Sequence, residues 1–365
     1  MVGGTAALAA VPVVSANWPV PSSQVAVDDV VATVLGSAPR SFVGLVESRG
    51  GLRLPDLGRY DDEVAPFARE TRARIWYAGP TRWRASELLV GGERGTYREP
   101  ELLWTWDSGD RDIEQSPRQG DEPLRLPRVM DLSPSELGRR LLSEAAATGL
   151  TIDPLPSRRI AGHVGAGLRF VPAAGTPTTV DAVELWADPG TGLVLRVDIY
   201  TSAGPPVFET SFVELELVAP ADDAVRFPID DIDPDRIDLT PSEPIELLTG
   251  LAFARLPDQL GGLRRRNPPE QGVATYGDGL VQITVIAAPS GSLGRRIARL
   301  PRSSRPWGGE AVLVSTSLIN TQLVSAGGLD IVVAGTVTVD ELDRLVGELR
   351  RELGLDDRDS AGDDG

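Results

Sequence analysis

The sequence predicts an α+β protein built on antiparallel sheets. Three observations lead to this prediction. Strand-like segments follow one another in runs, and only three segments have the spacing of an amphipathic helix. Turns rich in Gly, Pro and Asp join neighbouring strand-like segments, as in hairpins. The chain also lacks the regular alternation of strand and helix that a parallel sheet requires.

The first element is an amphipathic helix over residues 24–35, which Gly36 ends. Its apolar side chains recur at the i, i+3, i+4, i+7 spacing of one helical face. They are Val27, Val30, Val31, Val34 and Leu35. Strand-like segments follow at 42–48, 72–77, 82–89 and 102–106. The turn Ala78-Gly79-Pro80-Thr81 predicts that the second and third of these form a hairpin.

A second helix begins at Ser133. The stretch Ser133-Pro134-Ser135-Glu136 has the pattern of a capping box with proline at the first helical position, and Gly149 ends the helix. Further strands are expected at 160–171, 183–187, 193–200 and 208–218. The turn Asp188–Gly192 predicts that the middle two pair with each other.

Residues 227–246 form an acidic segment with seven carboxylates and four prolines, which is typical of a linker. We therefore expect a first domain at 24–226 and a second at 247–355, followed by a disordered acidic tail at 356–365. Asp231, Asp233 and Asp235 have the spacing of calcium ligands. However, Arg236 stands where an EF-hand loop requires glycine, so we expect no metal or other cofactor.

The second domain should contain strands at 280–287, 311–317, 321–324 and 330–334. A last helix follows the capping box Thr338-Val339-Asp340-Glu341. Its buried face is formed by Leu342, Leu345, Val346 and Leu349. This domain is thus expected to be a smaller antiparallel α+β unit.

Composition excludes many catalytic chemistries. The chain contains one histidine, His163, and neither cysteine nor lysine. It therefore lacks thiolate nucleophiles, cysteine-ligated zinc, Walker A loops and Schiff bases. Its net charge of −17 disfavours nucleic-acid partners, because phosphate neutralisation needs basic patches. We expect a binding protein, not an enzyme, and a structural role for His163.

The N-terminal residues 1–23 indicate export. Residues 3–14 are uncharged and apolar or small, and Val14-Ser15-Ala16 resembles a signal-peptide cleavage site. The first basic residue is Arg40, so the usual basic start of a signal is missing, and an apolar tail is the alternative. We expect a signal or membrane-anchor remnant and a location at the cell envelope.

Several motifs resemble one known group of proteins. In the first domain they are SFVGLVESRG (41–50), PTRWRASELL (80–89), RRIAGHVGAGLRFVPA (158–173), VELWADPGTGLVLRVDIY (183–200) and FETSFVELEL (208–217). In the second they are ATYGDGLVQITVI (274–286) and IVVAGTVTVDELDRLV (331–346). Together they resemble the LolA/LppX/RseB group, followed by the C-terminal domain of the RseB/MucB sigma-factor regulatory proteins.

The resemblance implies a curved antiparallel half-barrel sheet wrapped around helices, followed by the smaller domain. The concave face would hold an acyl chain of a lipid or lipoprotein. The second domain would contact a membrane-spanning regulatory protein of the anti-sigma-factor type. The implied function is therefore a non-enzymatic, extracytoplasmic regulator.

Two sets of residues are candidates for these contacts. Aromatic and leucine side chains on the strands of the first domain could line a lipid site, with ordinary core packing as the alternative. They are Trp76, Trp83, Trp104, Trp106, Trp186, Leu193 and Leu195. The basic run Arg264, Arg265 and Arg266 could contact a partner or a lipid headgroup, or form a solvated loop.

Two other functions remain open. The protein could carry a lipid or lipoprotein without a regulatory partner, but simple carriers of the LolA type lack a second domain. It could also be a carboxylate-based hydrolase of envelope glycans, which predicts turnover that is lost when one Asp or Glu is replaced.

Overall fold

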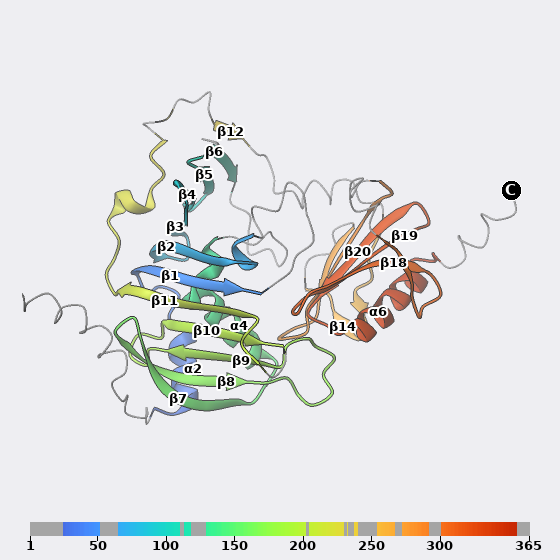
Figure 1. Cartoon of the computed structure of the whole chain (residues 1–365), viewed down its shortest axis with the longest axis horizontal. Coiled ribbons are helices and arrows are strands. Elements are labelled where there is room, and N and C mark those ends of the chain that lie inside the picture. The colour runs from blue at the N-terminus through green and yellow to red at the C-terminus, as the bar shows by residue number, and fades with distance from the viewer. Residues whose placement is uncertain are drawn as a thin grey trace, which may run out of the picture.

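The structure, a computed structural model, describes residues 25–51, 65–109, 113–117, 129–201, 204–229, 232, 237–239, 254–266, 272–291 and 301–355. The predictions for residues 1–23 and 356–365 concern parts of the chain outside these ranges. Two sheets dominate the fold, one of twelve strands and one of six (Figure 1). Within the described ranges, no helix is long and apolar enough to span a membrane.

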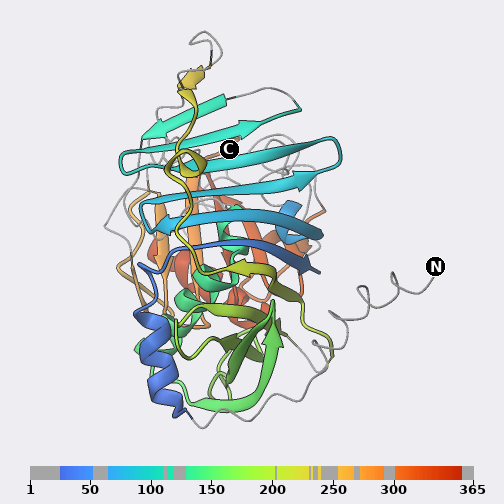
Figure 2. The same ribbon diagram turned by 90° about the vertical axis from the view of Figure 1, so that its left-hand side faces the viewer.

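The first sheet has the order β12-β6-β5-β4-β3-β2-β1-β11-β10-β9-β8-β7 and is antiparallel except where β12 joins β6. Its strands are β1 (Phe42–Gly50), β2 (Glu70–Gly79), β3 (Arg82–Leu89), β4 (Gly92–Arg98), β5 (Leu102–Asp107), β6 (Ile113–Pro117), β7 (Ile152–Ile160), β8 (His163–Phe170), β9 (Ala182–Ala187), β10 (Val194–Tyr200), β11 (Phe208–Glu216) and β12 (Ile237–Leu239). The sheet curves around two helices, so the predicted antiparallel α+β class is confirmed (Figures 1 and 2).

The helices inside the curve are α2 (Val27–Leu35) and α4 (Pro134–Ala147). Val30 and Val34 of α2 are fully buried, as the helical spacing predicted. Leu142 and Ala145 of α4 are also buried, and they join the same hydrophobic core. One face of the sheet therefore packs on helices, and we call it the helix-facing side; the other is the back face.

The expected strand at 160–171 is a hairpin in the structure. β7 ends at Ile160, Ala161 and Gly162 turn with positive φ, and β8 begins at His163. The prediction missed β7 because it contains Pro154 and Pro156, and prolines disfavour strands. They are tolerated here because β7 is an edge strand, where backbone N–H groups need no ladder partner.

The capping box expected at Ser133 is wrong in its hydrogen bonds. Helix α4 begins as predicted, but the Ser133 hydroxyl makes no cap bond. Instead, the Ser135 hydroxyl donates to the carbonyl of Val194 at 2.9 Å and ties the helix start to β10. At the second predicted box, the hydroxyl of Thr338 does accept from the Glu341 N–H.

The second domain has a six-stranded sheet of order β15-β16-β20-β19-β18-β17, with α6 (Val339–Glu352) on one face. Its strands are β15 (Val273–Tyr276), β16 (Ile283–Pro289), β17 (Ser303–Ser304), β18 (Glu310–Ser315), β19 (Asn320–Ala326) and β20 (Leu329–Gly335). A separate hairpin is formed by β13 (Gln259–Leu260) and β14 (Leu263–Arg264). The buried residues of α6 include all four predicted ones, Leu342, Leu345, Val346 and Leu349.

The acidic segment 227–246 is partly packed against the first sheet, although composition indicated a linker. Phe227 stacks on Trp104 with 4.5 Å between ring centroids. Its backbone N–H also donates to the Glu99 carboxylate at 3.0 Å. Further along, β12 pairs parallel with β6. The described part of this segment thus crosses the back face and reaches the edge of the first sheet.

Candidate functional site

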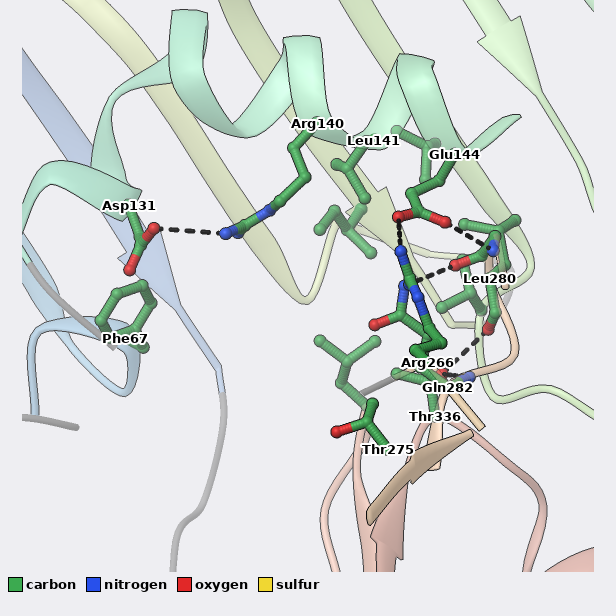
Figure 3. Close-up of a pocket in the computed structure, with 15 residues that line it drawn as sticks. Phe67, Asp131, Arg140, Leu141, Glu144, Arg266, Thr275, Leu280, Gln282 and Thr336 are labelled. Atoms are coloured by element: carbon green, nitrogen blue, oxygen red, sulfur yellow. Dashed lines mark hydrogen bonds and ion pairs between the residues drawn. The ribbon is translucent and has the colours of Figure 1, made fainter. Parts of the chain in front are cut away.

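The two domains enclose a cavity of about 470 Å³ where they meet (Figure 3). Its walls come from β9, β10, α4 and two 3₁₀ helices of the first domain, and from the loops and strand ends of the second. The lining residues are Phe67, Asp131, Arg140, Leu141, Glu144, Val180, Val183, Ile199, Arg266, Thr275, Gly279, Leu280, Gln282, Leu318 and Thr336.

Apolar side chains from both domains form part of this wall. Val183 of β9 and Ile199 of β10 line the cavity from the first sheet. Leu141 projects from α4 (Figure 3). Leu280 and Leu318 come from the second domain but pack against the hydrophobic core of the first. The cavity is therefore bounded by a hydrophobic contact that joins the domains.

Glu144, in the last turn of α4, joins the domains by polar contacts. One of its oxygens accepts from the Arg266 guanidinium at 2.6 Å, and the other accepts from the Gly279 N–H at 3.0 Å (Figure 3). The side chains of Glu144 and Arg266 are 18% and 31% exposed, so water screens this pair only in part. One carboxylate at the wall of the cavity thus makes two of the polar contacts between the domains.

A second ion pair lies at the other end of the cavity. Arg140 of α4 reaches Asp131 of η3 (Val129–Leu132) at 3.3 Å. The Arg140 side chain is 54% exposed, whereas that of Asp131 is 11% exposed. The cavity thus combines an apolar wall with two guanidinium groups, each already paired with a carboxylate.

The loop between β8 and β9 inserts into the second domain. The Thr178 hydroxyl lies 2.7 Å from the Thr336 carbonyl and 2.8 Å from that of Leu280. The backbone N–H of Thr179 donates to the Thr336 carbonyl at 3.1 Å, and its hydroxyl donates to that of Leu318. These bonds fix the second domain against the rim of the first sheet beside the cavity.

Three of the five candidate tryptophans lie together on the back face, away from the helices. The register pairs Trp76 with Arg84, Arg84 with Tyr97, and Tyr97 with Trp104, so these side chains share one face. The Arg84 guanidinium stacks 4.5 Å from the Trp76 ring. Trp106 is on the same face, two residues after Trp104 in β5. Trp104 and Trp106 pack in a small cluster with Phe227.

Three of the remaining four lipid-site candidates, Trp83, Leu193 and Leu195, are core residues of the first domain. Trp83 lies opposite Tyr77 on the helix-facing side. Leu193 and Leu195 are buried in the same core. Trp186 is on the back face, where its indole N–H donates to the Pro156 carbonyl at 3.1 Å. None of these seven residues lines the cavity between the domains.

The basic run 264–266 makes contacts within the chain. Arg264 is exposed. Arg265 donates to the carbonyls of Leu256 and Val273 and so connects the β13–β14 hairpin to the second sheet. Arg266 pairs with Glu144 across the domain boundary. Of the three candidates, the structure therefore places Arg266 at the cavity.

Burial affects the tyrosine beside this run. Tyr276 ends β15, and its hydroxyl donates to the Pro257 carbonyl at 2.8 Å. Desolvation raises the pKa of Tyr276 to about 12, partly offset by the nearby Arg265 cation. The phenol is thus neutral at physiological pH and holds the segment before β13 against the second sheet.

Sequence reasoning missed most cavity residues. Arg140 and Glu144 have the spacing of the polar face of α4, which predicts solvent exposure. The turn Tyr276-Gly277-Asp278-Gly279 was visible in the sequence and does reach the cavity, where the N–H of its last residue donates to the Glu144 carboxylate. His163 lies 3.5 Å from Asp188 at the surface, outside the cavity. In the described ranges, no three His, Cys, Asp or Glu side chains group as a metal site.

Comparison with known proteins gives matches among solved structures. No protein-family model and no curated protein matches the chain. A solved structure of MucB in complex with MucA(peri) is similar over 88% of this chain and 97% of that one, with 16% identity and a TM-score of 0.49. The MucA/MucB complex of Pseudomonas aeruginosa is similar over 87% and 96%, with 19% identity and a TM-score of 0.47.

The chain is also similar to a LolA superfamily protein from Nitrosomonas europaea. That likeness covers 56% of this chain and 99% of the other, with 10% identity and a TM-score of 0.24. All of these likenesses concern the fold alone.

Proposed function

We propose that this protein is a non-enzymatic binding protein of the cell envelope. Its cavity takes a lipid or the acyl chain of a lipoprotein, and its second domain contacts a membrane-spanning regulatory protein of the anti-sigma-factor type. The observation that carries the proposal is the cavity between the domains, because residues of both domains line it. Export through residues 1–23 is part of the same proposal.

The size and lining of the cavity fit a hydrophobic ligand. Small-molecule sites have volumes of roughly 300–1,000 Å³ and are mostly apolar, with a few placed polar groups. The cavity of about 470 Å³ falls in this range. Val183, Ile199 and Leu141 offer an apolar surface to an acyl chain, and the paired charges at both ends offer contacts to a polar head.

The position of the cavity supports regulation. A ligand that touches both domains changes the free energy of their relative arrangement, unless it binds every arrangement equally well. A partner that binds one arrangement better is then released or recruited when the ligand enters. The membrane partner itself is proposed from the likeness of residues 274–286 and 331–346 to RseB/MucB proteins.

A binding assay with a cavity-filling variant tests the proposal. The ligand probe is a fluorescent long-chain fatty acid, titrated into the full chain. Leu141→Trp should weaken binding at least tenfold, because the indole occupies the cavity. Val213→Trp is the matched control, since Val213 is 49% exposed outside the cavity. Equal affinity in both variants, or no binding to the wild-type protein, would contradict the proposal.

A further inference from the structure

Glu144 is placed to connect the ligand site with the contact between the domains. It lines the cavity and also makes two charge-assisted contacts with the second domain, to the Arg266 guanidinium and to the Gly279 N–H. Hydrogen bonds of this kind are roughly twice as strong as neutral ones. An event in the cavity that disturbs this carboxylate therefore weakens both contacts at once.

Arg266 has one close carboxylate, and a ligand could replace it. Its distance to Glu144 is 2.6 Å, whereas Asp278 lies 3.7 Å away and is 62% exposed. A guanidinium binds any planar carboxylate in the same way, whether it belongs to the protein or to a ligand. An acidic group that enters the cavity thus competes with Glu144 for Arg266.

We propose that Glu144 is the residue through which the cavity controls the domains, and that the controlling ligand is an acidic amphiphile. Its acyl chain lies against Leu141, Val183 and Ile199, and its acidic group replaces Glu144 on Arg266. The displaced carboxylate then releases the Gly279 N–H, and the domains separate at this edge. This inference rests on the proposed function, because it names the ligand class and the regulation of the same cavity.

The Thr178 and Leu280 contacts set the limits of the motion. These contacts lie on the neighbouring side of the cavity and involve neutral groups, which an acidic ligand does not compete for. The domains should therefore hinge about the Thr178 loop and open beside Glu144. A neutral amphiphile with the same chain should fill the cavity without opening it.

A distance measurement between the domains tests the inference without any ligand. The chain has no cysteine, so spin labels attach only at introduced ones. Val90→Cys and Ser315→Cys place one label on an exposed residue of each domain. Glu144→Ala should raise the open fraction about tenfold, the loss expected for charge-assisted hydrogen bonds. The control is Glu136→Gln, because Glu136 pairs with Arg139 on its own helix.

A charge exchange separates electrostatics from packing. The double variant Glu144→Arg with Arg266→Glu restores an ion pair with the charges exchanged, but not the hydrogen bond to the Gly279 N–H. It should therefore return the distances part of the way toward those of the wild type. Unchanged distances in Glu144→Ala would overturn the inference. The double variant could also leave the domains as open as the two single variants do. That result would overturn the inference as well.

The ligand arm compares palmitate with hexadecan-1-ol at equal occupancy. Palmitate should lengthen the distances in the wild-type protein and have no further effect in Glu144→Ala, whereas hexadecan-1-ol should leave both unchanged. Equal opening by the two ligands would refute the exchange at Arg266. If neither ligand binds, the proposed function and the ligand class fail together, while the Glu144→Ala distances still decide whether Glu144 holds the domains.

Discussion

Leu280→Ala should destabilise the first domain, although Leu280 belongs to the second. Leu280 follows β15 in the second domain, but its side chain is 7% exposed and lies in the core of the first domain. Leu→Ala removes about three methylene equivalents, worth roughly 0.8 kcal/mol each. With the cavity that remains, the expected loss is about 3 kcal/mol in the free energy of unfolding.

Tryptophan fluorescence during urea unfolding measures this effect in the right domain. Five of the seven tryptophans belong to the strands of the first sheet, so the signal reports mainly on that domain. Leu280→Ala should lower the midpoint of the fluorescence transition. The control is Leu342→Ala, which truncates a fully buried leucine in the core of the second domain.

Leu280→Ala could instead leave the fluorescence midpoint within error of the wild type while Leu342→Ala destabilises the second domain. That result would mean that the first domain does not use Leu280 in its core. An equal shift in both variants would instead show that the two domains unfold as one unit, and circular dichroism should then follow the same transition.

Three further predictions concern single side chains. Gly192→Ala should destabilise the first domain by more than about 1 kcal/mol in a urea titration. Gly192 has φ +76°, and an added Cβ would meet the Thr33 carbonyl oxygen. An unchanged free energy of unfolding would mean that α2 can move away from the new methyl group. Asp343→Ala should lower the free energy of unfolding by about 3–5 kcal/mol, measured by thermal unfolding. The substitution removes the carboxylate that pairs with Arg305 at 2.8 Å and leaves this guanidinium, whose side chain is only 12% exposed, without its partner. Asp340→Ala, on the same helix, is the control. The neutral Tyr276 phenol should stabilise the protein less as the solution becomes alkaline. Burial raises its pKa to about 12 in the folded protein, whereas the pKa of an unfolded tyrosine is about 10. Its contribution to the free energy of unfolding is therefore complete below the unfolded pKa and disappears as the pH rises through about 12. Tyr276→Phe should therefore show a shallower loss of stability between pH 10 and 12, and an unchanged slope would contradict this assignment.

Local signals in the sequence were sufficient for most helices and hairpins. The turn after β9 was predictable because Asp188 accepts from the N–H groups of Gly190 and Thr191, at 2.8 and 3.0 Å, within a few residues. The strand β4 was missed because Gly92 and Gly95 weaken the strand pattern. Its place in the sheet depends instead on pairing with β3 and β5, which lie on either side.

Long-range contacts explain why the site could not be predicted. The two-residue spacing of Trp104 and Trp106 correctly put them on one face, but spacing does not tell which face meets the helices. The environment of the two tryptophans depends instead on Phe227, which covers the back face and lies more than a hundred residues away in the sequence. Glu144 and Arg266 are similarly distant, and only the folded chain brings them to one cavity.

Native mass spectrometry of the full chain purified from a bacterial host shows whether the protein carries a lipid. We expect a 1:1 adduct with the mass of an acyl lipid or lipopeptide, recovered by organic extraction and reduced in Leu141→Trp but not in Val213→Trp. A protein that has the mass of the bare chain, and that takes up neither added fatty acid nor lipopeptide, would contradict the claim that the cavity between the domains is a lipid site.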